Sequence, residues 1–204
     1  MRFAVVYDTE FLVTQDARQR FWSGPYDPDP IVVQIGAVRL GIEGDFAIMD
    51  TLRVHIRPVD RHGSAVPVDP FFEKLTGITA GTLDDEGVPL AMALDKLVEF
   101  SGTAKLWSWG KDELNLMAIS CFVAGIAPPI PAARFGNACA LVLAAGMPYD
   151  DVKVTRSSDL ADYFGVPHPP LAGHDGLDDA LSVAYALQHL LRAGALSPDA
   201  LDPT

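Results

Sequence analysis

The 204-residue sequence predicts an α/β fold in which a mixed five-stranded sheet carries helices on both faces. Three observations lead to this prediction. The chain opens with three segments rich in β-branched residues, helical periodicity then alternates with two further short strands, and we find no internal repeat or low-complexity tract. Strands followed by alternating helices and strands are typical of a mixed sheet, here with three antiparallel strands first and parallel strands after them.

The first half of the chain supplies the antiparallel part. Residues 3–8 (FAVVYD) form a nearly continuous apolar run, as in a strand that is buried on both faces. The runs 31–40 and 46–57 are separated by turn residues at 41–45, which predicts an antiparallel pair. The mostly polar segment 13–30 ends in GPYDPDP, so we expect a loop there.

The second half alternates helices with strands. Helical spacing begins near residue 69 and is clearest over 87–100, and residues 104–109 predict a fourth strand followed by a helix from about 112. After a Pro-rich break we expect a fifth strand near 134–139, short helices at about 139–146 and 156–164, a last helix over 176–192, and a frayed end. The sequence thus predicts one domain over 1–192 and a short C-terminal tail over 193–204.

Composition excludes some classes of function. The formal net charge of -12 argues against a protein that binds duplex nucleic acid through a large basic surface, because that binding depends on Lys and Arg side chains that neutralise phosphates. It does not exclude a nuclease, since cations bound to carboxylates reverse the local charge. No apolar run reaches the roughly eighteen residues of a membrane span, and Asp8 interrupts the apolar start before a signal-peptide core. We expect a soluble, cytoplasmic protein without a membrane partner.

Acidic residues occur at three strand ends or helix starts that are candidate positions for metal binding or catalysis. Asp8 and Glu10 stand two positions apart at the end of the first strand, so their side chains point to one face, where they either raise a pKa or share a hard cation. Asp112 follows the fourth strand, where open α/β sheets collect ligands, although an acid there also suits a helix N-terminus. His174 and Asp179 lie in GHDGLDDA at the start of the last helix.

In this order, the DTE segment, the junction Asp and the H-x4-D pair resemble the DEDDh exonucleases, the DnaQ-like branch of the ribonuclease-H-like fold. The resemblance spans about residues 3–192 and is strongest to the Eri-type and histone-mRNA-type 3′ exonucleases, on YDTEF, VVQIGAV, LTGIT, SWGKDELNL and HDGLDDA. It implies a 3′-to-5′ exonuclease that uses two Mg²⁺ or Mn²⁺ ions, with His174 as the general base. The implied metal ligands are Asp8, Glu10, Asp112 and Asp179.

The resemblance also implies which residues hold the 3′ end of the strand. The implied contacts are Thr9, Phe11, Leu12, Leu75 and Thr76. Phe11 and Leu75 suit core positions equally well. The H-x4-D spacing selects Asp179, whereas Asp178 lies about one helical turn from His174 and remains the alternative.

The substrate implied by the resemblance is single-stranded nucleic acid with a 3′ end, RNA before DNA. A DNA proofreading or repair exonuclease is the near alternative. Two further alternatives are a catalytically idle exonuclease fold that serves as a binding or scaffold module, and a metal-dependent hydrolase of small phosphoesters. In the early loop, Arg18 and Arg20 either track phosphates of an entering strand or are simply solvated.

Overall fold

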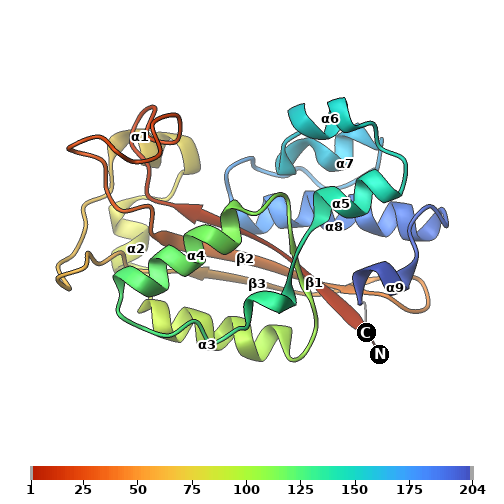
Figure 1. Cartoon of the computed structure of the whole chain (residues 1–204), viewed down its shortest axis with the longest axis horizontal. Coiled ribbons are helices and arrows are strands. Elements are labelled where there is room, and N and C mark those ends of the chain that lie inside the picture. Colours follow the sequence, from red (N-terminus) through yellow and green to blue (C-terminus); the bar gives the residue numbers. More distant parts are fainter. Residues whose placement is uncertain (1, 203–204) are drawn as a thin grey trace.

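The structure is a computed structural model that describes residues 2–202 (Figure 1). Its centre is a five-stranded sheet in the order β3-β2-β1-β4-β5. The strands are β1 (Phe3–Phe11), β2 (Val32–Gly41), β3 (Ile48–His55), β4 (Leu106–Ser108) and β5 (Phe135–Asn137). β1, β2 and β3 pair antiparallel, whereas β4 pairs parallel with β1 and β5 pairs parallel with β4. The predicted sheet is confirmed.

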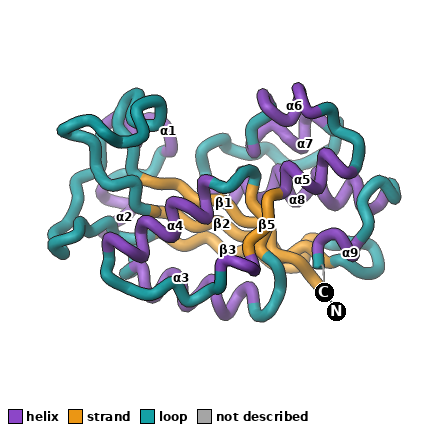
Figure 2. The backbone as a smooth tube through the Cα atoms, viewed as in Figure 1, coloured by secondary structure: helices purple, strands orange, loops and turns teal. Residues whose placement is uncertain are grey.

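Helices cover both faces of the sheet, as predicted (Figure 2). They are α1 (Pro70–Thr76), α2 (Ala80–Glu86), α3 (Leu90–Ser101), α4 (Asp112–Val123), α5 (Ala138–Ala144), α6 (Tyr149–Val154), α7 (Leu160–Tyr163), α8 (Gly176–Arg192) and α9 (Pro198–Leu201), with short 3-10 turns at Ala132–Arg134 and Ser157–Asp159. The sequence prediction lacked α6. Within residues 2–202, no helix is long and apolar enough to cross a membrane.

Successive side chains of β1 alternate between the two faces of the sheet, and this determines which helices each side chain packs against. Ala4 and Val6 pack in the cluster that contains α8, whereas Val5 and Tyr7 pack in the cluster that contains α3 and α4. Because successive side chains of a strand point to opposite faces, every second residue of β1 faces α8. The strand is also longer than the predicted 3–8, since it continues to pair with β2 as far as Phe11.

The C-terminal segment corrects one expectation. We expected the chain after residue 192 to fray, but Leu196 and Leu201 are buried in the cluster beside α8. Trp107 of β4 also donates a hydrogen bond from Nε1 to the carbonyl oxygen of Leu201, at 3.0 Å. The first and last described residues lie side by side (Figure 1), since Arg2 forms an ion pair with Asp202. Residues 203 and 204 of the predicted tail lie outside the described residues.

Candidate active site

Three carboxylates from two elements meet at the centre of the molecule. Asp8 and Glu10 continue the α8-facing alternation of β1, and Asp179 lies on α8. Each of the three has one oxygen within 4.8 Å of the corresponding oxygens of the other two. All three residues are buried, with exposed fractions of 6%, 7% and 6%. The packing of α8 on β1 therefore brings together acidic residues that are far apart in the sequence.

The sheet fixes the position of the start of α8. A Cβ atom added to Gly36 of β2 would lie 2.1 Å from the carbonyl carbon of Gly176, so only glycine allows this approach. The buried Gln34 side chain accepts a hydrogen bond from the Gly176 N–H at 2.6 Å and donates to Asp175 at 3.1 Å. Asp175 caps α8 by accepting hydrogen bonds from the backbone N–H groups of Leu177 and Asp178.

Burial and mutual repulsion disfavour the charged forms of these three carboxyl groups, and among the described residues no Lys or Arg forms an ion pair with any of them to offset this. Burial raises the pKa of Asp8 well above its usual range, and the nearby Glu113 and Asp179 raise it further. Burial and then Asp179 raise the pKa of Glu10 to about 8. The pKa of Asp179 is raised to about 7 by burial, against a hydrogen bond from Ser157.

The same cluster fits a hard divalent cation. Among the described residues, the buried Oδ1 of Asp179 has no hydrogen-bond partner. Grouped carboxylate oxygens are the ligands that Mg²⁺ and Mn²⁺ prefer. A cation would thus supply both the missing partner and the missing positive charge.

A cavity of about 580 Å³ lies beside this cluster. Among the predicted site residues, it is lined by Asp8, Thr9, Glu10, Phe11, Leu75, Asp112, His174 and Asp179. Leu12 and Thr76 do not line it. Leu12 is buried against Phe72 in a separate apolar cluster, and the Thr76 hydroxyl donates to the Phe72 carbonyl oxygen at the end of α1. In this structure the side chain of Leu12 therefore serves packing and that of Thr76 helix termination, and their contact with substrate stays a prediction.

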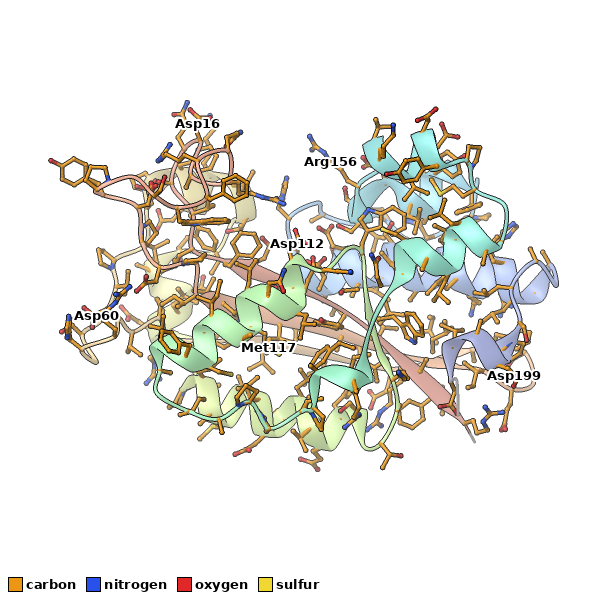
Figure 3. All side chains as sticks on the ribbon, viewed as in Figure 1. Asp16, Asp60, Asp112, Met117, Arg156 and Asp199 are labelled. Atoms are coloured by element: carbon orange, nitrogen blue, oxygen red, sulfur yellow. The ribbon has the colours of Figure 1, made fainter. Side chains whose placement is uncertain are left out.

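Asp112 reaches the cavity from the start of α4 but stands apart from the three buried carboxylates. Its Oδ2 accepts a hydrogen bond from Arg18 Nη2 at 3.1 Å. Figure 3 shows Asp112 at the N-terminal end of α4, with Arg156 above it on the side of α6 and α7.

The next residue, Glu113, also lines the cavity and is buried. Burial and then Asp112 raise its pKa to about 8. Sequence analysis missed Glu113, although the adjacent acids in KDELNL were a signal for it.

His174 lines the same cavity from the loop before α8. Its backbone φ is +63°, in the left-handed region that His tolerates better than most residues. Burial lowers the pKa of His174, and the cations Arg156 and Arg18 lower it further. Asp178, the alternative to Asp179, accepts hydrogen bonds from Arg53 and from the Ala172 N–H and is not among the residues that line the cavity.

The strand order and the helices on both faces of the sheet are those of a ribonuclease-H-like fold, as in solved structures of DEDDh 3′ exonucleases. A structure of the nuclease domain of 3′hExo, a DEDDh family member bound to rAMP, matches with a TM-score of 0.76 and 19% identity, over 95% of this chain and 93% of that chain.

A 3′-exonuclease that recognises the histone mRNA stem-loop matches with a TM-score of 0.73 and 16% identity, over 95% of this chain and 83% of its own. E. coli exonuclease I in complex with a dA16 oligonucleotide matches with a TM-score of 0.60 and 15% identity, over 95% of this chain and 41% of its own. No protein-family model matches the sequence, and a search of curated proteins found no match. At these identities the likeness shows the fold.

Proposed function

We propose that this protein is a metal-dependent 3′-to-5′ exonuclease that releases nucleoside 5′-monophosphates from single-stranded nucleic acid. The observation that carries the proposal is the buried group of Asp8, Glu10 and Asp179 beside an open cavity that His174 also lines. The fold supports it, because the solved structures that share this fold include 3′ exonucleases with rAMP, a histone mRNA stem-loop or a DNA oligonucleotide.

The residues that would hold two Mg²⁺ or Mn²⁺ ions are Asp8, Glu10, Asp112 and Asp179. When bound, such ions supply positive charge to the scissile phosphate and to the leaving 3′-oxygen. The protein contributes a site in which three of the carboxylates are already together and desolvated. Because their pKa values are raised, these carboxyl groups release protons when a cation binds.

His174 is the group that would accept the proton from the attacking water. Its lowered pKa keeps the imidazole neutral near pH 7, which is the form that accepts a proton. The water oxygen then forms a bond to phosphorus, the bond to the 3′-oxygen breaks, and the 3′-oxygen takes up a proton from solvent, so the shortened strand ends in a new 3′-hydroxyl and the released nucleotide carries the phosphate at its 5′ end. The left-handed backbone at His174 and the anchored start of α8 support this role, because they constrain the backbone that carries the imidazole.

Residues on the cavity wall suit the end of a strand. Phe11 and Leu75 present partly exposed apolar side chains, and Thr9 lies between the two acidic residues of β1. Stacking of bases on such side chains tolerates any sequence and contributes roughly 1 to 3 kcal/mol per base. RNA is the favoured substrate, because the neighbours with rAMP or an mRNA stem-loop have higher TM-scores than the neighbour with dA16.

The experiment that tests this function is digestion of matched 5′-labelled single-stranded RNA and DNA oligomers with Mg²⁺ and then Mn²⁺. An Asp8→Asn variant controls for a contaminating nuclease. A ladder that shortens from the 3′ end, faster for RNA and absent in the variant, is expected. If neither strand is degraded but a small phosphoester is hydrolysed, the chain is a small-molecule phosphoesterase. If nothing is hydrolysed, the chain is a binding module.

A further inference from the structure

Two arginines, Arg18 and Arg156, are among the residues that line the cavity, and Arg18 has an acidic partner there. The sequence suggested equal roles for Arg18 and Arg20, but the structure separates them. Arg20 binds the Asp27 carboxylate and donates to the Gln15 carbonyl oxygen inside the loop. Arg18 instead reaches out of the loop, with its guanidinium 5.7 Å from the centre of the Phe11 ring and 3.1 Å from Asp112.

The ion pair between Arg18 and Asp112 differs from the rest of the site. Asp8, Glu10 and Asp179 form a buried group, whereas the fourth predicted metal ligand is paired with a cation of the protein itself. Both side chains of the pair are largely open to water, with exposed fractions of 59% and 44%. Exposed pairs contribute little free energy, so either partner exchanges readily for a better one.

The loop that carries Arg18 does not need this ion pair to hold its shape. Asp27 accepts hydrogen bonds from Thr14, Arg20 and the Gly24 N–H within the loop. Trp22 donates from Nε1 to the Leu12 carbonyl oxygen at 3.1 Å, and the buried Ala17 packs against the core. Because these contacts fix the backbone, the Arg18 side chain is free to change partners while its base stays in place.

We propose that Arg18 is an exchangeable counter-ion, which holds Asp112 until a divalent cation takes that carboxylate and then binds a phosphate of the strand. A guanidinium matches phosphate oxygens in a two-point fashion, and its position over Phe11 places it beside the proposed contact for the 3′ end. The metal half of this proposal depends only on the carboxylates, whereas the phosphate half rests on the proposed function.

The metal half is tested by isothermal titration calorimetry with Mn²⁺ and no nucleic acid. Arg18→Ala is expected to tighten Mn²⁺ binding by about 1.5- to 5-fold, since it removes an exposed competing pair. In an Asp112→Asn background the same substitution is expected to have no effect. Arg156→Ala is the matched control, because Arg156 also lines the cavity and no ion pair joins it to Asp112 in the described structure.

The phosphate half is tested by fluorescence anisotropy of a labelled single-stranded oligonucleotide in Ca²⁺. Arg18→Ala is expected to weaken strand binding several-fold and to lower the slope of log affinity against log salt by about one phosphate contact. Thermal melting checks that each variant is folded. Opposite changes in metal affinity and strand affinity are the signature of exchange.

Three results would overturn parts of this proposal. Equal or weaker Mn²⁺ binding by Arg18→Ala, or the same gain in Arg156→Ala, refutes the competition for Asp112. Unchanged strand binding by Arg18→Ala, with the wild type binding well, refutes the phosphate contact alone. If the wild type binds no strand, the proposed function and the phosphate contact both fail, and calorimetry still decides the metal half.

Discussion

The buried acidic cluster should make the metal-free protein less stable as the pH rises. Glu10 shows the direction in which stability changes with pH, because its pKa in the folded protein is about 8, above its ordinary value of 4.5. Below pH 4.5 the carboxyl is protonated whether the chain is folded or not. Between 4.5 and about 8, only the unfolded chain releases the proton, so the free energy of unfolding falls by about 1.4 kcal/mol per pH unit for this one group.

Asp8 and Asp179 add to this effect in the same direction, although mutual repulsion makes the sum smaller than three independent groups. For a chain of this size, 1.4 kcal/mol corresponds to a change in melting temperature of about 3 to 6 °C. A divalent cation should reverse the trend, because it binds the deprotonated carboxylates and stabilises the fold most at high pH.

The assay is thermal unfolding in EDTA across about pH 5.5 to 7.5, repeated with Mn²⁺. Glu10→Gln should flatten the pH dependence and raise the melting temperature at the upper end. Glu99→Gln, the same substitution at an exposed position of α3, should leave the profile unchanged. A melting temperature that stays constant or rises with pH in EDTA would refute the view that these carboxylates are uncompensated.

Four further substitutions test the site. His174→Asn, chosen because Asn tolerates the left-handed backbone, should lower turnover by about 100-fold or more while Mn²⁺ affinity by calorimetry stays near wild type. At saturating Mn²⁺, which holds the carboxylates deprotonated, the acid limb of the wild-type pH–rate profile should have its midpoint below 6.5, and a midpoint above that value would exclude His174 as the base. Asp112→Asn should abolish hydrolysis, whereas Glu113→Gln should cost at most about tenfold, and equal losses would make Glu113 a ligand. Gly36→Ala should destabilise the fold by about 1 to 3 kcal/mol in urea unfolding and lower activity, because its Cβ would push Gly176 off the sheet. An active, equally stable variant would show that α8 need not be fixed there.

Sequence patterns predicted the parts of the fold that follow from periodicity. The two-residue period of a strand was enough to place Asp8 and Glu10 on one face of β1, whereas Asp179 came from the resemblance to the DEDDh exonucleases. The family's H-x4-D spacing separated Asp179 from Asp178, and the structure holds Asp178 against Arg53. The relation between Asp8 and Glu10 is local, so it can be inferred without coordinates, whereas the choice between Asp178 and Asp179 needed the resemblance.

Features that depend on contacts distant in sequence could not be predicted. Leu201 is part of the core because it packs in the cluster beside α8 and its carbonyl oxygen accepts a hydrogen bond from Trp107, which lies 94 residues earlier in the chain. The partner of Arg18 lies 94 residues away on another element. Glu113 was missed because adjacent acids at a helix start usually face water, and only the packing of α4 shows which of the two is buried.

The most direct test of the central claim uses one single-stranded RNA labelled in separate preparations at its 3′ and 5′ ends, incubated with Mn²⁺. A 3′-to-5′ exonuclease releases the 3′ label at once as a mononucleotide, while the 5′ label passes through a ladder of decreasing length. The proposed function predicts this pattern, with a nucleoside 5′-monophosphate as the product and no product from Asp8→Asn. Early release of the 5′ label, internal fragments only, or equal activity of Asp8→Asn would contradict it.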